Sequence, residues 1–370
     1  MKIVYLSHAR VPSRTANSLN VMKMCEAFAQ NGHDVILFVP RRSNAEPGVK
    51  DPFAFYGVEP CFGLKRFPRK KKGLRGLLHH TVVSTLIRLR RPDLLFGRDH
   101  SLRYDLDEFG LPVVIDAHKL VDDAANRRRL PKLIQSGRLR RLVTTTDVLA
   151  GDYAREFGIP RDRIVVARNA ADEPGSIEAL DLPPPERLRV GYLGHLYPGK
   201  GMERIAEMAP RCPWASFHVV GGAESDLADW ERKMEGCENL FFHGYRPHAE
   251  TGRYRQSMDV LLAPYQLEIT SESGGTIDAR SMSPIKIFEY MAAGKAILAS
   301  DLPAIREILT DRVNARLCPA DDTTSWVDAL EELRDQPTLR EALGQAAREA
   351  FRANHTWRAR AKTMLDGIEA

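Results

Sequence analysis

The sequence has no uninterrupted apolar run of about 18 residues, so it predicts no membrane-spanning helix. The apolar run at its start, in MKIVYLSHARVPSR, is too short for a secretory signal peptide. Its five cysteines lie far apart, with no CxxC pair, which argues against a disulfide framework or a zinc site and favours a reducing cytoplasm. The motifs GxGxxG and GxxxxGKS/T are also missing, so neither a dinucleotide fingerprint nor a Walker loop is predicted.

Length and composition indicate an ordinary globular protein of two or three domains. The 370 residues are 43% hydrophobic and 28% charged. The net charge of +5 hides an asymmetry: residues 1–180 hold 31 Lys and Arg against 20 Asp and Glu, a net of +11, whereas residues 181–370 have a net of −6. The basic half predicts a surface for something anionic, which leaves nucleic acid, anionic lipid and phosphorylated substrates open.

Short apolar runs alternate with helical patterns along the whole chain, which is typical of βαβ units in a parallel sheet. Residues 173–187, with three consecutive prolines, interrupt this alternation and are expected to be a linker. We therefore expect an α/β fold of two tandem Rossmann-like, doubly wound domains, residues 1–180 and 186–350, with ligands bound in the cleft between them. A final helix within residues 351–370 has no strand after it and could pack back on the first domain. The predicted strands are Lys2–Ser7, Asp34–Pro40, Asp93–Arg98, Pro112–His118, Arg141–Thr146, Ile164–Ala167, Leu188–Leu193, Ser216–Val220, Leu240–His243, Asp259–Pro264 and Ala296–Ser300.

The most specific stretch is SPIKIFEYMAAG, residues 283–294. Ser283 suits an N-cap, Pro284 the first helical position and Gly294 the helix end, and the apolar residues all round predict a buried helix. Lys286 in the first turn suits phosphate oxygens, and Glu289, three residues later, would need donors such as ribose hydroxyls. The alternative is a Lys286–Glu289 pair on an ordinary core helix.

A second stretch, VGYLGHLYPGKG at residues 190–201, places a strand before a Gly- and Pro-containing loop. Such a loop can bring backbone N–H groups and a lysine against phosphates, although Gly-rich turns between a strand and a helix are also common for structural reasons alone.

Together with PVVIDAH, RIVVARNAAD, ANSLNVMKMCEAFAQNGHDV and MDVLLAPY, these stretches resemble the family-4 (GT4) retaining glycosyltransferases of the GT-B fold. The resemblance runs from about residue 1 to 310. It implies transfer of a sugar from a nucleotide-diphospho-sugar to a hydroxyl acceptor with retention at the anomeric carbon, and no cofactor or metal. A lipid-linked or cell-surface glycan is the expected acceptor.

The resemblance also implies roles for individual residues. Lys200, His118 and Glu289 would be the catalytic set, with Lys200 on the pyrophosphate, His118 on the donor sugar and Glu289 on the ribose. The remaining donor-binding residues would be Asn17, Gly194, His195, Gly244, Tyr245, Arg246, Ser283 and Lys286. His195 stands where many relatives have arginine, so a donor is kept but its charge depends on pH. Ser281 stands where relatives often have a glutamate that contacts the donor sugar, which leaves the identity of that sugar open.

Two other readings of the same scaffold remain: another enzyme class, such as a nucleotide-sugar epimerase or a phosphorylase, and a subunit that has lost catalysis. An epimerase would need acid/base carboxylates in the cleft, and a phosphorylase a pyridoxal-phosphate lysine for which no motif exists. Ala170 and Ser281 favour a non-catalytic subunit mildly, whereas Lys200, Glu289 and His118 argue against it. The polar residues 265–283 could be the donor-sugar loop or a surface loop.

The acceptor side is expected in the basic half. Arg98, at the end of DLLFGRD, could reach the cleft or pair with Asp99 or Asp116. The basic run from Lys65 to Arg91 includes Lys70 and Lys71 and has leucines between its basic residues. Such a segment could lie on the anionic inner face of the cell membrane. A core helix flanked by solvated charges is the alternative. Nucleic acid is not a predicted partner, because no recognised motif accompanies the charge.

Overall fold

A computed structural model describes residues 1–41, 46–67, 83–98, 106–270 and 276–368. Two compact units make up the chain: Met1–Arg168 with Trp357–Ala370, and Asn169–Thr356. The boundary differs from the predicted one, because residues 169–185 belong to the second unit. Leu182 lies in its core, and the Leu180 N–H donates to Ser257 Oγ at 2.6 Å. The proline-rich stretch is therefore anchored to the second unit.

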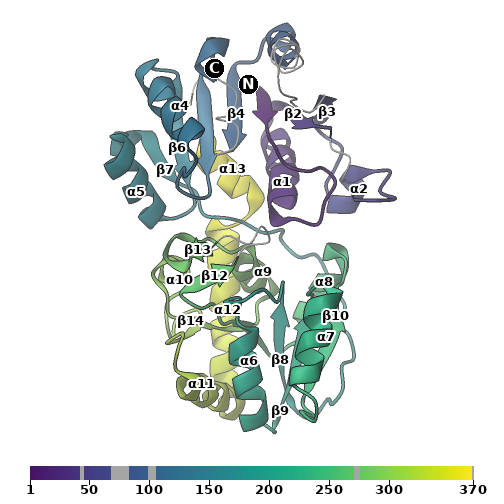
Figure 1. The fold of residues 1–370 in the computed structure, drawn as a ribbon. Coiled ribbons are helices and arrows are strands. Elements are labelled where there is room, and N and C mark those ends of the chain that lie inside the picture. The colour runs from purple at the N-terminus through teal and green to yellow at the C-terminus, as the bar shows by residue number, and fades with distance from the viewer. Residues whose placement is uncertain (42–45, 68–82, 99–105, 271–275, 369–370) are drawn as a thin grey trace. The chain divides into compact units, whose positions relative to one another are not determined.

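The first unit is built on a parallel sheet of seven strands in the order β3-β2-β1-β4-β5-β6-β7 (Figure 1). The strands are β1 (Lys2–Leu6), β2 (Asp34–Pro40), β3 (Gly63–Phe67), β4 (Leu94–Arg98), β5 (Val113–Ala117), β6 (Leu139–Thr144) and β7 (Ile164–Val166). Near-continuous apolar runs form the central strands, as expected for a sheet covered on both faces. The edge strand β3 is absent from the sequence prediction.

Helices cover both faces of this sheet. They are α1 (Ala16–Gln30), α2 (Pro52–Tyr56), α4 (Ala124–Gln135), α5 (Asp147–Phe157) and α13 (Trp357–Leu365), with 3-10 turns η2 (Leu106–Phe109) and η3 (Arg161–Arg163). The Thr15 side chain caps α1 by accepting from Ser18 N. The C-terminal helix α13 packs against α1 (Figure 1), so the last segment of the chain completes the first unit.

The second unit has a parallel sheet of six strands in the order β10-β9-β8-β11-β14-β15. These are β8 (Leu188–Leu193), β9 (Ala215–Val220), β10 (Leu240–Gly244), β11 (Val260–Ala263), β14 (Ala296–Ser300) and β15 (Arg316–Cys318). Residues 265–283, expected to be a loop, contain a short antiparallel pair, β12 (Glu268–Thr270) and β13 (Thr276–Asp278). The expected doubly wound α/β architecture is thus confirmed in both units.

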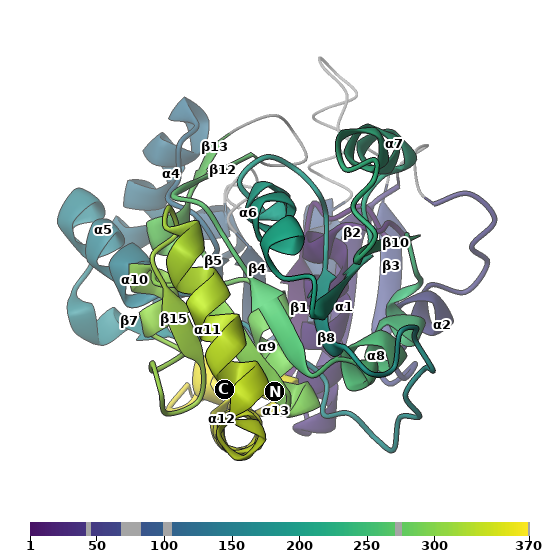
Figure 2. The ribbon, with the colours of Figure 1, turned by 90° about the horizontal axis from the view of Figure 1, so that it is seen from below.

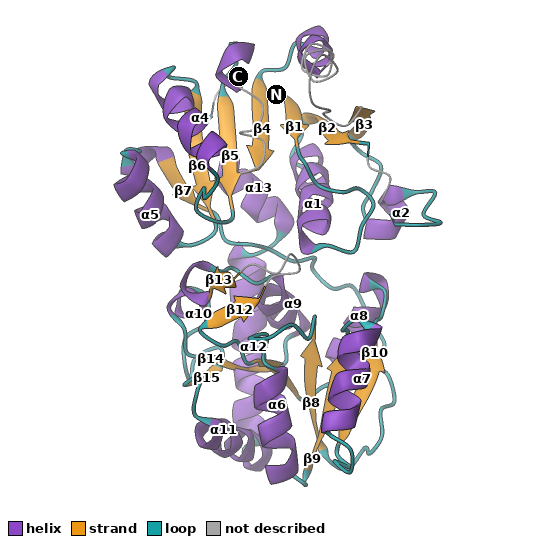
Figure 3. Ribbon diagram, in the orientation of Figure 1, coloured by secondary structure: helices purple, strands orange, loops and turns teal. Residues whose placement is uncertain are grey.

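Two cores hold the second unit together, one on each face of its sheet. The helices are α6 (Met202–Met208), α7 (Glu224–Lys233), α8 (His248–Ser257), α9 (Ile285–Ala293), α10 (Pro303–Arg306), α11 (Thr323–Asp335) and α12 (Pro337–Asn354), with 3-10 turns η4 (Ala209–Arg211) and η5 (Ala279–Ser281). Helix α12 lies beside α11 and α9 (Figures 2 and 3). None of the helices in the described parts of the chain is both long and apolar enough to cross a membrane.

Candidate active site

In the structure, helix α9 begins one residue later than the capping pattern predicts. Pro284 is the N-cap, and the helix starts at Ile285 without a side-chain cap. The Ser283 hydroxyl is used elsewhere, since it accepts from the backbone N–H of Asn169 at 3.2 Å. Gly294 ends the helix in the left-handed conformation, φ 69°, as predicted.

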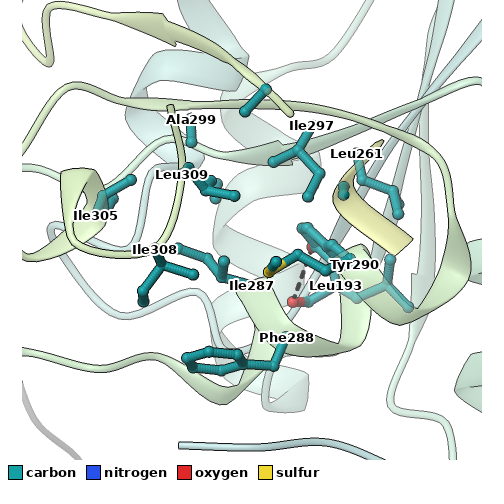
Figure 4. Close-up of a cluster of buried hydrophobic side chains, with 14 of the residues drawn as sticks. Leu193, Leu261, Ile287, Phe288, Tyr290, Ile297, Ala299, Ile305, Ile308 and Leu309 are labelled. Carbon is teal, nitrogen blue, oxygen red and sulfur yellow. Dashed lines mark hydrogen bonds between the residues drawn. The ribbon is translucent and has the colours of Figure 1, made fainter. Parts of the chain in front are cut away.

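The buried face of α9 fixes the helix firmly against the sheet. Ile287, Phe288 and Tyr290 are fully buried and belong to the same hydrophobic core as Leu261 and Ile297 of the neighbouring strands (Figure 4). The Tyr290 hydroxyl accepts from the Leu193 backbone N–H at 2.9 Å, which ties α9 to the end of β8. The two polar residues of interest, Lys286 and Glu289, are thereby held on a rigid element.

The Lys286 ammonium lies in an aromatic cage at the carboxyl end of β8. Its Nζ is 3.7 Å from the ring centroid of Tyr192 and 5.3 Å from that of Tyr265, beside Gly194. It is buried and has no hydrogen-bond partner among the described residues. Burial, reinforced by the charge of Lys200, lowers the pKa of Lys286 well below its ordinary value. A buried ammonium without a hydrogen-bond partner is costly, and an anion is the kind of ligand that would compensate it.

The loop between β8 and α6 brings Lys200 to the same place. Lys200 Nζ lies 5.6 Å from the ring centroid of Tyr265, and burial lowers its pKa. Gly199 has φ +80°, and a Cβ there would meet the backbone oxygen of Glu268. Only glycine satisfies both conditions, so the loop is held close to the segment that follows β11.

His195 lies on the solvent side of this loop. Its side chain is exposed and stacks on Tyr197, with centroids 4.9 Å apart, while its backbone carbonyl accepts from the Tyr192 hydroxyl at 2.6 Å. Tyr192 therefore holds the loop through its hydroxyl and contacts the Lys286 ammonium through its ring.

Glu289 is turned toward α8. Its carboxylate lies 3.3 Å from Arg255 Nη1 and 3.7 Å from His248 Nδ1, and its side chain is 15% exposed. Burial alone would raise the pKa of Glu289, but the charges of Arg255, His248 and Lys286 lower it, so the group is ionised. It lines a pocket between α8, α9 and the segment after Asn169; the other lining residues are Ala171, Asp172, Pro174, Ile177, His248, Gly252, Arg255, Gln256, Ala292 and Ala293.

The predicted nucleobase residues adjoin Gly194 through the backbone. The Gly194 N–H donates to Val220 O at 2.9 Å, and the Gly221 N–H donates to Gly244 O at 2.8 Å. Beyond Gly244, Tyr245 is 44% exposed and the Arg246 guanidinium lies 5.9 Å from the ring centroid of Tyr254. The carboxyl ends of β8, β9 and β10 thus form one edge that carries both predicted sites.

Beneath this edge, two histidines from neighbouring strands are stacked. His218 Nδ1 and His243 Nε2 are 3.0 Å apart, and their ring centroids are 5.3 Å apart. Burial, followed by the charge of His243, lowers the pKa of His218 to about 4. Both histidines are neutral at neutral pH and form part of the support of the edge.

His118 belongs to the first unit, directly after β5. Its Nε2 is 2.9 Å from Asp116 Oδ2, and Asp116 Oδ1 accepts from Arg360 Nη2 at 3.0 Å. Arg98, at the end of β4, donates to Asn20 Oδ1 at 3.0 Å. Asn17, in the first turn of α1, has a buried Oδ1 without a hydrogen-bond partner among the described residues.

Lys70 and Lys71 lie outside the described residues. At the C-terminal end of the same basic run, residues 83–90 are helical, and Leu86 and Leu89 are 40% and 75% exposed. Among the residues that the structure describes, no group of three or more His, Cys, Asp or Glu is placed to hold a metal ion.

The structure brings Lys200, Lys286 and Gly194 together in the second unit, whereas His118, Arg98 and Asn17 belong to the first. Sequence reasoning missed the tyrosines under Lys286, the partners of Glu289 on α8, and Arg360. The sequence does point to Asp116, because a carboxylate at the end of an apolar strand, two residues before a histidine, is rarely buried without a role.

Two units, each with a parallel sheet and an α/β fold, match the GT-B architecture of known glycosyltransferases. Over the full chain, the structure is similar to the crystal structure of Anabaena Alr3699/HepE in complex with UDP, with a TM-score of 0.77, 13% identity and coverage of 100% of this chain and 99% of that one. A sucrose-phosphate synthase from Thermosynechococcus elongatus gives a TM-score of 0.75 at 15% identity, with coverage of 98% and 97%.

The sequence matches two family models, "Glycosyltransferase Family 4" over residues 20–173 and "Glycosyl transferases group 1" over residues 187–336. A D-inositol 3-phosphate glycosyltransferase of Corynebacterium diphtheriae is 26% identical, covering 95% of this chain and 89% of the relative. A phosphatidyl-myo-inositol mannosyltransferase of Mycolicibacterium smegmatis is 33% identical over 47% of this chain and 43% of its own length. The chain belongs to the family-4, group 1 glycosyltransferases, a retaining family that uses nucleotide-sugar donors.

Proposed function

We propose that this glycosyltransferase transfers its sugar to a hydroxyl of an anionic acceptor, either lipid-linked or a glycan at a membrane surface, and that Lys286 and Lys200 hold the donor diphosphate. The observation that carries the donor half of the proposal is the Lys286 ammonium, buried without a hydrogen-bond partner in the described chain and beside a second lysine.

In the proposed reaction, negative charge develops on the leaving diphosphate as the sugar departs. Lys286 lies on the buried helix α9, and Lys200 lies in a loop that Gly199 holds close to Glu268, so both are in place to stabilise that charge. A protonated His195 would add a further donor at the rim of the loop. The leaving phosphate accepts the proton of the acceptor hydroxyl on the same face, so no side-chain base is assigned.

Glu289 would hold the ribose hydroxyls while Arg255 keeps its carboxylate ionised and oriented. Gly244, Tyr245 and Arg246 would hold the base, and Ser283 and Asn17 would lie near the phosphates. His118 would accept a hydrogen bond from the donor sugar. Each of these roles is inferred from position within the family motif and from the contacts described above.

The donor half is tested by thermal-shift measurements with UDP, GDP and ADP and their sugars. At least one nucleotide should stabilise the protein, and Lys200→Ala and Glu289→Ala should each lower kcat/KM for the donor. Glu250→Ala, an exposed carboxylate on α8, is the matched control. Unchanged kinetics in both site variants would refute the assignment.

The acceptor half rests on charge and on two relatives. Residues 1–180 carry a net charge of +11, more than the donor site in the second unit can use. The names of the relatives from C. diphtheriae and M. smegmatis both specify inositol phosphates, one free and one in a lipid. We infer an acceptor of that chemistry: a polyol hydroxyl beside a phosphate.

The transfer of radiolabelled sugar is measured with a free inositol phosphate and with phosphatidylinositol in vesicles as acceptors. The comparison shows whether the acceptor is the free or the lipid-linked form. For the lipid form, flotation should show binding to anionic and not to neutral vesicles. Leu86→Gln with Leu89→Gln should reduce flotation, whereas Val313→Gln, which is 60% exposed in the second unit, should not. Equal binding to neutral and anionic vesicles would exclude the membrane part of the proposal.

A further inference from the structure

The C-terminal helix α13 places a buried arginine at the end of β5, in the first unit. Arg360 has a side-chain exposure of 1%, and its Nη2 donates to Asp116 Oδ1 at 3.0 Å. Its Nε donates to the carbonyl of Arg168 at 2.9 Å, just after β7. One guanidinium therefore fixes the buried Asp116 carboxylate relative to the far edge of the sheet.

The other oxygen of Asp116 contacts His118. Although burial raises the pKa of Asp116, the charge of Arg360, the hydrogen bond from His118 and the charge of Arg98 lower it far below the ordinary value, so the group is ionised. An ionised carboxylate can only accept, so His118 carries its proton on Nε2, where it donates to Asp116 Oδ2. In that tautomer, Nδ1 is the ring atom with the acceptor lone pair.

The charge balance around His118 keeps the ring neutral. Burial lowers the pKa of His118 to about 4, and the charges of Arg98 on β4 and Arg360 on α13 lower it as well, against the opposing effect of Asp116. Among the residues that the structure describes, Tyr5 on β1 also interacts with Asp116; its pKa is raised by burial and by Asp116, so it is neutral. Without Arg360, the carboxylate of Asp116 would draw a second proton onto the ring.

We propose that Arg360 is a positioning residue of the transfer reaction: by holding Asp116, it keeps His118 neutral, with its proton on Nε2 and Nδ1 as the acceptor for a donor-sugar hydroxyl. This inference rests on the proposed function, in which His118 contacts the donor sugar. Arg360 itself touches neither substrate. A carboxylate that sets the tautomer of a histidine is a known device, and here the arginine controls the charge of that carboxylate.

The test compares Arg360→Met with Arg358→Met, an exposed arginine of the same helix. The titration of His118 is followed by NMR of ¹⁵N-histidine-labelled protein, with His118→Asn to assign the signal, and the pH profile of kcat/KM is measured for both variants. Arg360→Met should raise the pKa of His118 by about one unit or more and move the acid limb of the activity profile upward by the same amount. Arg360→Lys, which keeps the charge, should restore most of both, and Arg358→Met should change neither.

The two measurements separate the inference from the proposed function. An unchanged titration of His118 in a folded Arg360→Met would overturn the inference, whatever the activity. A shifted titration with an unshifted activity profile would support the link from Arg360 to His118 and refute the role of His118 in the reaction. If Arg360→Met does not fold, Arg360→Gln and Asp116→Asn are measured instead; Gln should raise and Asn should lower the pKa of His118, and no shift in either would overturn the inference.

Discussion

Replacing Lys286 by methionine should stabilise the folded protein and weaken donor binding at the same time. The ammonium is buried without a hydrogen-bond partner among the described residues and lies next to a second lysine, so the free protein holds it at a cost. Methionine keeps most of the apolar stem and removes the charge. A residue that serves only the fold would not give opposite signs in these two measurements.

The size of the stability change follows from three contributions. Removing an unsatisfied buried polar group recovers about 1–3 kcal/mol. Losing the cation above the Tyr192 ring, 3.7 Å from Nζ to centroid, costs about 0.5–2 kcal/mol. A methionine sulfur near the same ring returns about 0.3–1.5 kcal/mol. The midpoints sum to a gain of about 1.5 kcal/mol, which is about 3–6 °C in Tm for a unit of this size.

The gain should depend on pH in a defined direction. Since the folded protein lowers the pKa of Lys286, the unfolded chain binds more protons, and the resulting destabilisation is complete well below the folded pKa. It disappears as the pH rises toward the ordinary lysine value of about 10.5. The advantage of Lys286→Met over the wild type should therefore shrink between pH 7 and pH 9.5.

Donor affinity should fall in the same variant, because one charge-assisted contact to phosphate is lost. Such a contact contributes about 1.5–3 kcal/mol, which corresponds to about 10- to 150-fold in Kd. Urea unfolding gives the stability, and calorimetric titration gives the Kd of whichever nucleotide stabilises the wild type most.

Lys233→Met is the matched control. Lys233 also lies over an aromatic ring, with Nζ 4.5 Å from the Trp230 centroid, but it is exposed. It should lose a little stability and no donor affinity. If Lys286→Met were less stable than the wild type, the Lys286 ammonium would not destabilise the fold. If the nucleotide Kd of Lys286→Met were unchanged, Lys286 would not bind phosphate.

Two further predictions concern the second sheet and the loop that follows β8. Burial lowers the pKa of His218 to about 4, against about 6.5 in the unfolded chain, so the unfolded state binds more protons between these pH values. The free energy of unfolding should therefore fall by up to about 3 kcal/mol as the pH drops from about 6.5 to about 4. In urea unfolding, the stability of His218→Gln should depend less steeply on pH than that of the wild type, and an equal dependence would contradict this reasoning. Gly199→Ala and Gly236→Ala share a positive φ, +80° and +85°, but only the first meets a backbone oxygen. Gly236→Ala should lose about 1–2 kcal/mol, and Gly199→Ala should lose more, together with donor affinity; equal losses would show that the loop yields freely.

The sequence was a good guide to the strands that are buried on both sides. Asp34–Pro40, Leu188–Leu193 and Ala296–Ser300 were predicted with their observed bounds, because most of their residues are apolar and buried. The strands Gly63–Phe67 and Arg316–Cys318 were missed. Both lie at sheet edges and are partly exposed, so polar residues interrupt the pattern that reveals a strand.

For the candidate site, local motifs predicted lysines but not their surroundings. Lys200 and Lys286 lie in recognisable stretches, whereas Tyr192 and Tyr265 reach Lys286 only through the packing of β8, β11 and α9. Arg360 lies 244 residues from Asp116 in the sequence, and no spacing rule joins them. The proposed Ser283 cap failed for a similar reason, because Asn169, a distant residue, uses its hydroxyl.

The path of the chain has a consequence for dissecting the protein. The second unit is one continuous segment, residues 169–356, but the first is closed by residues from the opposite end of the sequence. A fragment that stops at Arg168 would lack α13, so the face of α1 that packs on it would be exposed and Asp116 would lose the guanidinium that balances its charge. A circularly permuted chain, with Trp357–Ala370 joined ahead of Met1, would retain both in a single contiguous piece.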